Sequence, residues 1–207
     1  MALQSPPTAA PAPPPGLTPE ALQQLHEARA RSKKIRRAVT VAHFDGWCVA
    51  IFAGLTLMGS AVSFSFPGML VGIGMGAVAW IEFTSARQLV QLDPASIKRL
   101  AWNQLFLAGI LLAYAAYALW TGLRDPAAYA GVVSSQLNDP ELARMVGPIE
   151  NLVRWLLLAI YGTLAFVAIT VQGSTALYYL TRGKYLRAYL EQTPRWILDA
   201  QRSGLPI

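Results

Sequence analysis

The sequence predicts an all-α, polytopic membrane protein in which four transmembrane helices form a bundle and amphipathic cytoplasmic helices lie at both ends. Of the 207 residues, 54% are hydrophobic and only 14% are charged, whereas a soluble domain usually carries about 25% charged residues. Apolar stretches close to the length that crosses a bilayer recur along the chain, with basic residues flanking them. We expect the transmembrane helices at about residues 47–64, 68–83, 102–120 and 152–171.

The chain begins with a segment that is not expected to fold. Residues 1–17 are rich in proline and alanine and carry no charged side chain, which is typical of a disordered tail rather than of a secretory signal peptide. Thr18-Pro19-Glu20 then forms a helix start, with a capping side chain, a proline at the first helical position and an acid near the positive end of the dipole.

The helix that follows, over residues 18–42, is strongly basic in its second half, where six lysines and arginines fall between positions 29 and 37. One interpretation is an amphipathic cytoplasmic helix on an anionic leaflet, with Arg36 and Arg37 at the lipid headgroups. The other is a solvated helix whose charges only fix the topology. The apolar face is too weak to separate the two.

The second transmembrane helix is unusual because glycines recur along it. Gly68, Gly72 and Gly76 are four residues apart, so on a helix they form one smooth stripe on which a neighbour packs closely in lipid. The turn that joins this helix to the first is very short, so the two form an antiparallel hairpin. Packing within the subunit is therefore favoured over the alternative, a seam between copies of the chain.

The remaining elements follow from capping and proline signals. Asp93-Pro94 starts a short helix before the third transmembrane helix, which tryptophans bracket at both ends. The loop over 121–151 carries two further Asp-Pro pairs, which predict short helices near 126–137 and 140–146. The fourth transmembrane helix, predicted at about 152–171, has Leu180 as an alternative end. The transmembrane domain as a whole is expected over 43–180. The C-terminal segment over 181–207 is expected to be amphipathic, with one helix at 184–192 and a break at Thr193-Pro194.

Orientation follows from the distribution of the 17 lysines and arginines. Fourteen lie on one side of the predicted membrane: six in the N-terminal segment, three in the loop over 84–101 and five in the C-terminal segment. The positive-inside rule therefore places both termini in the cytoplasm. The net charge of +6 indicates anionic lipids at the cytoplasmic face rather than a nucleic acid, because the basic residues flank the apolar segments.

The sequence carries no motif of a soluble enzyme. The glycines of G-I-G-M-G at 72–76 lie inside a membrane helix rather than after a strand, so they do not form a nucleotide loop. His26, His43 and Cys48 are too few and too scattered for a metal or haem site. We therefore expect no catalytic residues, no cofactor and no metal.

Polar residues do gather near the cytoplasmic ends of the predicted transmembrane helices. Ionisable groups at membrane depth are costly, so they call for a functional hypothesis. One hypothesis is a polar pocket that binds a cation, a proton or a lipid headgroup; the other, which the sequence favours, is a hydrogen-bond network that locks the helix ends together. The residues are His43, Asp45, Glu82, Asn103, Gln104 and Gln172.

Arg154 is the counterpart at the outer side, where the fourth transmembrane helix begins beside Trp155. Its side chain is expected to reach the outer headgroups or to pair with Glu150, four residues earlier, with Asp125 as the next candidate. A substrate-binding arginine is the less favoured interpretation of this position.

Several phrases of the chain resemble a group of uncharacterised four-helix bacterial membrane proteins of planctomycete-type genomes. They are F-D-G-W-C-V-A-I-F-A-G (44–54), G-I-G-M-G-A-V-A-W-I-E (72–82), R-Q-L-V-Q-L-D-P (87–94), W-N-Q (102–104) and Y-L-E-Q-T-P-R-W (189–196). The resemblance covers about residues 40–200. It implies a multi-pass protein of a bacterial inner membrane, and it carries no activity.

Two functions remain open from the sequence. The first is a non-enzymatic scaffold or interaction subunit of the inner membrane, working with a homo-oligomeric or a membrane-protein partner. The alternative is a small oligomeric transporter or channel with a polar site around Glu82 on its cytoplasmic side. An intramembrane enzyme is the weakest candidate, because no nucleophile and base pair is visible.

Overall fold

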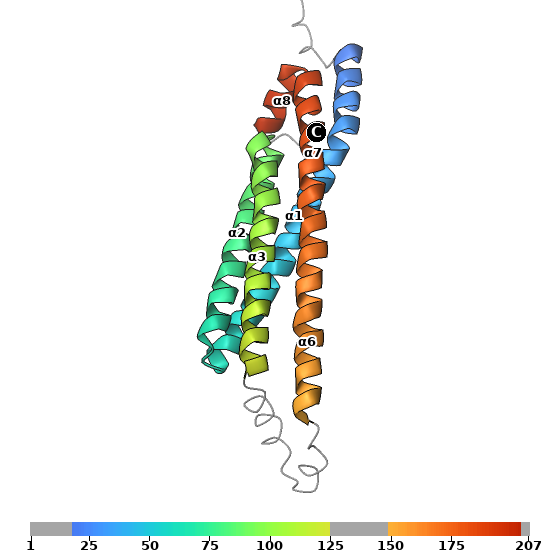
Figure 1. Ribbon diagram of the computed structural model, residues 1–207. Helices are drawn as coiled ribbons and strands as arrows, with labels where there is room; N and C mark the ends of the chain where they lie inside the picture. Colours follow the sequence, from blue (N-terminus) through green and yellow to red (C-terminus); the bar gives the residue numbers. More distant parts are fainter. Residues whose placement is uncertain (1–17, 125–148, 204–207) are drawn as a thin grey trace, which may run out of the picture.

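A computed structural model describes residues 18–124 and 149–203, and every element in these ranges is helical (Figure 1). The predicted tail over 1–17 and the predicted loop helices near 126–137 and 140–146 lie outside the described residues. Four helical runs are long and apolar enough to cross a membrane: Pro19–Val62, Phe66–Val90, Pro94–Arg124 and Leu152–Gln192. The described part of the chain is therefore all-helical with four candidate membrane spans, as the sequence predicts.

Helix α1 (Pro19–Val62) is a single helix of 44 residues, whereas the sequence predicts a basic helix that ends near position 42 and a membrane helix that begins at 47. Its start is the predicted one, since the Thr18 side chain accepts a hydrogen bond from the backbone N–H of Ala21 at 3.3 Å. The helix continues because no proline interrupts the stretch between its basic and apolar halves. A change of composition alone ends no helix.

Helix α2 (Phe66–Val90) follows α1 after a three-residue turn, in which Phe64 has a φ of 50°. Two glycines of the predicted stripe lie against α1. A Cβ atom added at Gly72 would lie 2.6 Å from Cγ of Leu57, and one at Gly68 would meet the Ser60 side chain. A Cβ added at Gly76 would meet no atom within 4 Å, so the close approach of the two helices involves only the first two glycines.

Helix α3 (Pro94–Arg124) contains both the short helix predicted at Asp93-Pro94 and the third transmembrane helix, without a break. The Asp93 carboxylate caps it by accepting a hydrogen bond from the backbone N–H of Ala95 at 3.0 Å. Leu92, with a φ of 62°, makes the turn from α2.

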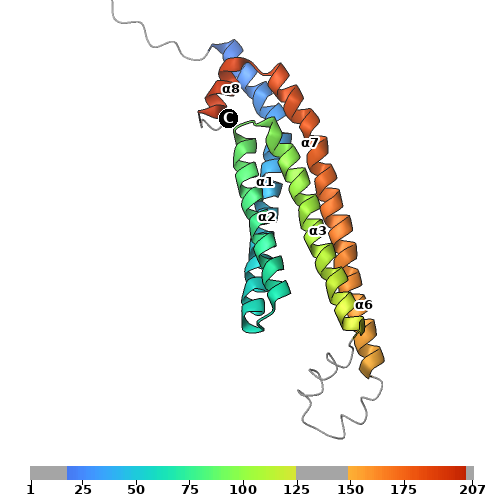
Figure 2. The same cartoon turned by 60° about the vertical axis from the view of Figure 1, so that its left-hand side comes forward.

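The last part of the chain forms one long helical run and a short final helix. Helix α6 (Ile149–Val167), the π-helical stretch η1 (Ala168–Gln172) and α7 (Gly173–Gln192) follow one another without a gap. The run is longer than the predicted fourth transmembrane helix, and it includes the helix expected at 184–192. It ends at Thr193-Pro194, as predicted, and α8 (Arg195–Arg202) packs back beside it (Figure 2).

Buried apolar side chains form two separate core layers. The first joins α1, α2, α3, α7 and α8 at the end of the molecule where α8 lies, and it is here called the cytoplasmic-end layer after the orientation that the sequence predicts. The second, here called the middle layer, joins α1, α2 and α3 further along the membrane spans. Its buried members are Val49, Ala53, Met75, Val78, Ala79 and Leu107.

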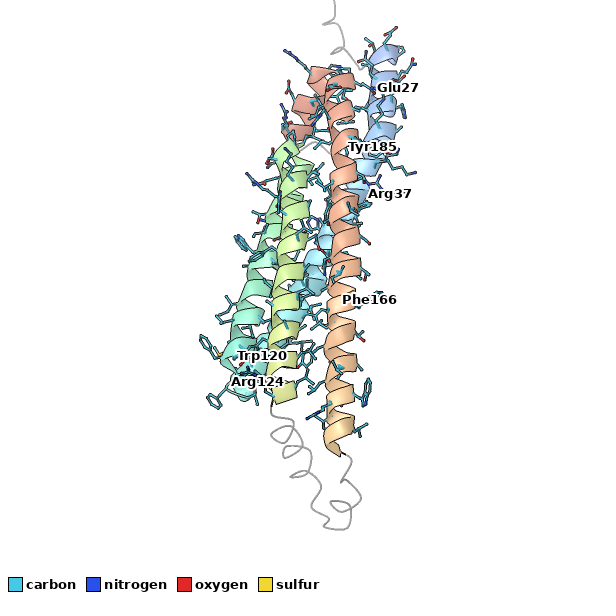
Figure 3. All side chains as sticks on the ribbon, viewed as in Figure 1. Glu27, Arg37, Trp120, Arg124, Phe166 and Tyr185 are labelled. Atoms are coloured by element: carbon cyan, nitrogen blue, oxygen red, sulfur yellow. The ribbon has the colours of Figure 1, made fainter. Side chains whose placement is uncertain are left out.

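The cytoplasmic-end layer holds the basic half of α1 in line with the rest of that helix. Ala28, Ile35 and Ala38 are buried in the same core as Leu186 of α7 and Ile197 of α8. Figure 3 shows Glu27 and Arg37 of α1 and Tyr185 of α7 at this end of the molecule. This half of α1 therefore packs along α7 and continues the membrane span, instead of bending away from it.

Exposed tryptophans mark two levels along the candidate spans. Trp47 and Trp80 line one groove, and Trp102 precedes Asn103, which contacts α2 at Val78. Trp120 lies at the opposite end of α3, where Figure 3 shows it beside Arg124. The 18 residues from Trp102 to Trp120 correspond to about 27 Å of helix, close to the roughly 30 Å of a hydrocarbon core.

Candidate functional site

Gln104 connects two carboxylates that come from different helices, one buried and one half-buried. Its side-chain Nε2 donates one hydrogen bond to Oδ2 of Asp45 on α1 and one to Oε1 of Glu82 on α2. Glu82 and Gln104 are 0% exposed, and Asp45 is half-buried. One amide group is thus the shared donor of both acids. We call Asp45, Glu82, Asn103 and Gln104 the polar cluster.

Local sequence explains how three helices come this close. Gly46 lies directly after Asp45, and a Cβ atom there would lie 3.2 Å from the Cβ of Glu82 and 3.2 Å from the Phe83 ring. The glycine therefore lets α1 approach α2 at the level of the acids. On the other side, Asn103 Nδ2 donates to the backbone carbonyl of Val78 at 3.0 Å, which ties α3 to α2 one turn below Glu82.

The polar cluster has more acceptor oxygens than donors. Oε2 of Glu82, Oδ1 of Asn103 and Oε1 of Gln104 are buried without a hydrogen-bond partner among the described residues. Leaving a buried polar group unpaired costs about 1–3 kcal/mol, and two nearby carboxylates repel each other when both are charged. The arrangement is therefore short of positive charge.

Tyr179 of α7 also belongs to this neighbourhood, although no sequence pattern singles it out. Its side chain is 0% exposed, its hydroxyl has no partner among the described residues, and it is buried in one core with Ala42, Ala86 and Ala101, each about one turn from a member of the polar cluster. With it, each of α1, α2, α3 and α7 contributes a polar group. The adjacent Tyr178 looks identical in the sequence, so only the packing shows which tyrosine faces inward.

The structure does not bring His43 into the polar cluster. Its Nδ1 lies 3.0 Å from the backbone carbonyl of Val39, and its ring lies 6.2 Å from that of Phe83. Two residues along a helix point about 200° apart, so His43 and Asp45 share a level but not a face. His43 instead lines a groove on the face of α1 and α2 that points away from the polar cluster.

Gln172 also stays outside the polar cluster. It is the last residue of η1, and its Oε1 is buried without a hydrogen-bond partner among the described residues. It precedes Tyr179 by seven residues, which corresponds to about 10 Å along a helix. The sequence predicts that the fourth transmembrane helix ends at about this position, with Leu180 as the alternative end. In the structure the helical run continues to Gln192, and Tyr179 lies in this continuation.

The three arginines expected at lipid headgroups are all exposed. Arg36 and Arg37 lie on α1 beside Arg29 and Lys33, where the four side chains line one basic groove. Arg154 lies near the start of α6; the side chain of its predicted partner Glu150 lies outside the described residues. Headgroup binding by these arginines stays a prediction.

Replacing Tyr179 by phenylalanine tests whether its hydroxyl stabilises the protein. The substitution removes a buried hydroxyl that has no partner in the described structure, so Tyr179→Phe is expected to leave the free energy of unfolding unchanged or to raise it by up to about 1 kcal/mol. Thermal denaturation in detergent measures this. A loss of more than about 1 kcal/mol would show that the hydroxyl has a stabilising partner.

Apolar side chains separate the polar cluster from both ends of the spans. The middle layer lies on one side, and the cytoplasmic-end layer, with Ala42, Leu89 and Tyr179, lies on the other. Among the described residues no group of three His, Cys, Asp or Glu side chains could hold a metal ion. The donor set is instead all oxygen, which suits a proton or a hard cation rather than a transition metal.

Comparison with known proteins adds no relative: no protein-family model, no curated protein and no solved structure matches this chain.

Proposed function

We propose that this chain is a multi-pass inner-membrane protein that binds one positive charge, a proton or a small hard cation, at the polar cluster, and that it acts as a small oligomeric transporter or channel. The observation that carries the proposal is that two acids, the half-buried Asp45 and the buried Glu82, share the side-chain N–H group of Gln104 as a donor. The sequence favoured the alternative, a hydrogen-bond network that locks the helix ends together. The full burial of Glu82 and Gln104 supports the binding site, because a buried acid is costly without a compensating positive charge.

The membrane orientation assumed in the proposal rests on the distribution of lysine and arginine and on the positions of the tryptophans. The distribution of lysine and arginine supports cytoplasmic termini, and the four long helices suit a bundle that crosses the bilayer. In that frame the polar cluster lies at the tryptophan level nearer the cytoplasm, because Glu82 follows Trp80 by two residues and Gln104 follows Trp102 by two. The site is therefore nearer the cytoplasm, and a ligand from that side must pass the cytoplasmic-end layer to reach it.

One added positive charge would satisfy what the polar cluster lacks. A proton shared by Asp45 and Glu82 removes their repulsion, and a cation would draw on the unpartnered oxygens of Glu82, Asn103 and Gln104. Asp45 is the entry point, because it is half-buried while Glu82 is fully enclosed. The middle layer closes the opposite side, so passage across the membrane requires those apolar side chains to part.

Flux through proteoliposomes tests the proposal with Glu82→Gln, which keeps the shape of the side chain and removes its charge. We expect the variant to lose at least tenfold in proton flux, followed with an internal pH dye, or in uptake of radioactive sodium. Glu191→Gln changes an exposed glutamate of α7 and is the matched control, expected to stay within twofold of the parent. Both variants must elute like the parent protein from size-exclusion chromatography.

The two assays also decide between the ligands. Proton flux without sodium uptake identifies a proton site, and sodium uptake that persists at constant pH identifies a cation site. If the parent protein supports neither flux, the transport proposal fails. Equal losses in Glu82→Gln and Glu191→Gln would contradict it as well, because the polar cluster would then play no special part.

A second candidate function, a non-enzymatic scaffold, is favoured by the cytoplasmic-end layer. There α1 extends its membrane span into a packed set of helices with α7 and α8, and its exposed face is basic. Such a surface suits anionic lipids or an acidic protein partner. Native mass spectrometry of the protein released from a mild detergent tests this: a defined complex with a second copy or another membrane protein supports it, and a bare monomer contradicts it.

A further inference from the structure

We infer that a groove on the face of the α1–α2 pair that points away from the polar cluster binds the phosphate of one anionic phospholipid from the cytoplasmic leaflet. The inference concerns a different site from the polar cluster and does not depend on it, because the groove lies on the opposite face of α1. Both helices contribute to its lining, with two tryptophans, one further aromatic ring, one hydroxyl, one imidazole and one guanidinium. The lining residues are His43, Trp47, Trp80, Phe83, Thr84 and Arg87.

Arg87 supplies the positive charge of the groove. It is exposed, and no carboxylate among the described residues forms an ion pair with it. Thr84 bonds its own helix at the Trp80 carbonyl, so the guanidinium is the charged donor group that α2 offers to a ligand here. A guanidinium presents a planar fork of N–H groups that matches two phosphate oxygens.

His43 provides a second polar contact from the facing helix. Its Nδ1 lies 3.0 Å from the Val39 carbonyl, so Nδ1 carries the hydrogen and Nε2 of the neutral ring is an acceptor, which suits a hydroxyl of the lipid headgroup rather than its phosphate. The acids of this level do not face the groove, since Asp45 and Glu82 are both bonded to Gln104 on the other side. An anion in the groove therefore meets cationic and neutral groups only.

The walls of the groove identify a lipid rather than free phosphate. Trp80 is 73% exposed, and the rings of Trp47 and Phe83 meet edge to face with centroids 5.6 Å apart. Exposed apolar side chains continue from Trp47 down the same face of α1, at Ile51 and Leu55. An acyl chain can lie along this stripe while its headgroup occupies the groove.

The level of the groove suits a headgroup. Tryptophans favour the boundary between hydrocarbon and headgroups, and Arg87 follows Trp80 by seven residues, about 10 Å further along α2. Helical side chains lean toward the N-terminus of their helix, so the arginine reaches back over Thr84 to the level where phosphates lie.

Lipid retention in native mass spectrometry tests the inference. The full-length protein is purified in a mild detergent, mixed with equal amounts of phosphatidylglycerol and phosphatidylethanolamine, and the retained lipids are counted. We expect one phosphatidylglycerol in preference to phosphatidylethanolamine. Arg87→Gln should lower its retention about tenfold, which is the size of one charge-assisted interaction. Arg187→Gln removes an exposed arginine of α7 that lies outside both grooves and should change retention less than twofold.

Two further measurements and one comparison distinguish a specific lipid site from binding of free phosphate and from attraction by net charge. Trp80→Ala should also reduce retention, because it removes a wall of the groove without changing the charge. Displacement of the lipid by millimolar inorganic phosphate would overturn the inference in favour of a free-phosphate site. Equal losses in Arg87→Gln and Arg187→Gln would overturn it too, since they would show attraction by net charge alone. Both arginines are exposed, so the variants are expected to fold, which circular dichroism checks.

Discussion

Gln104→Leu is expected to lower the free energy of unfolding by about 3 kcal/mol, the largest effect expected of any single substitution in this protein. Leucine has a similar volume but no N–H group, so Asp45 and Glu82 would lose the donor that they share. Removing one partner of a buried charged network costs roughly 3–5 kcal/mol. Denaturation in mixed detergent, followed by circular dichroism, measures the change.

Gln172→Leu is the matched control for this prediction. It makes the same chemical change at a residue whose Oε1 is buried but which forms no hydrogen bond to the polar cluster, so we expect a change below about 1 kcal/mol. Adding Glu82→Leu to Gln104→Leu should recover part of the loss, because one of the stranded carboxylates is then gone. Equal costs for the two glutamine substitutions would contradict the central role of Gln104.

Gly72→Ala is expected to destabilise the α1–α2 hairpin by about 2 kcal/mol, which is typical of overpacking. The new methyl group would lie 2.6 Å from Cγ and 3.2 Å from the backbone N of Leu57. The side chain of Leu57 can move, but its backbone cannot without parting the helices. The same denaturation assay reports the loss.

Gly76→Ala, one turn away on the same helix, should have the opposite sign. Its Cβ would meet no atom within 4 Å, and alanine is a better helix former than glycine by up to about 1 kcal/mol. Leu57→Ala combined with Gly72→Ala should relieve the overlap. If both glycine substitutions destabilise equally, the close approach at Gly72 does not limit the packing of the hairpin.

The helix starts and ends were largely predictable, because they depend on local chemistry. Thr18-Pro19, Asp93-Pro94 and Thr193-Pro194 each mark a boundary in the structure, since a capping side chain and a missing N–H act within a few residues. The continuity of α1 was not predictable in the same way. Its change from basic to apolar marks where a bilayer begins, and a backbone helix continues through that change.

The candidate site was predictable by depth but not by direction. Asp45, Glu82 and Gln104 could be grouped because they interrupt apolar segments at one level of the predicted topology. The direction of a side chain around its helix depends on which neighbours that helix meets, and this separates His43 from Asp45. Tyr179 carried no polar signal in the sequence, since a tyrosine on a membrane helix is as readily an interfacial or a core residue.

Because α1 is one unbroken helix, a tilt of its apolar half also displaces its basic half. About 42 Å of helix separate Trp47 from Pro19, so a tilt of about 10° at the tryptophan level swings the N-terminal end sideways by about 7 Å. The buried contacts with α7 and α8 oblige that end of the molecule to move together. A thinner or thicker bilayer changes the tilt of a helix. A change in bilayer thickness is therefore expected to displace the basic groove lined by Arg29, Lys33, Arg36 and Arg37.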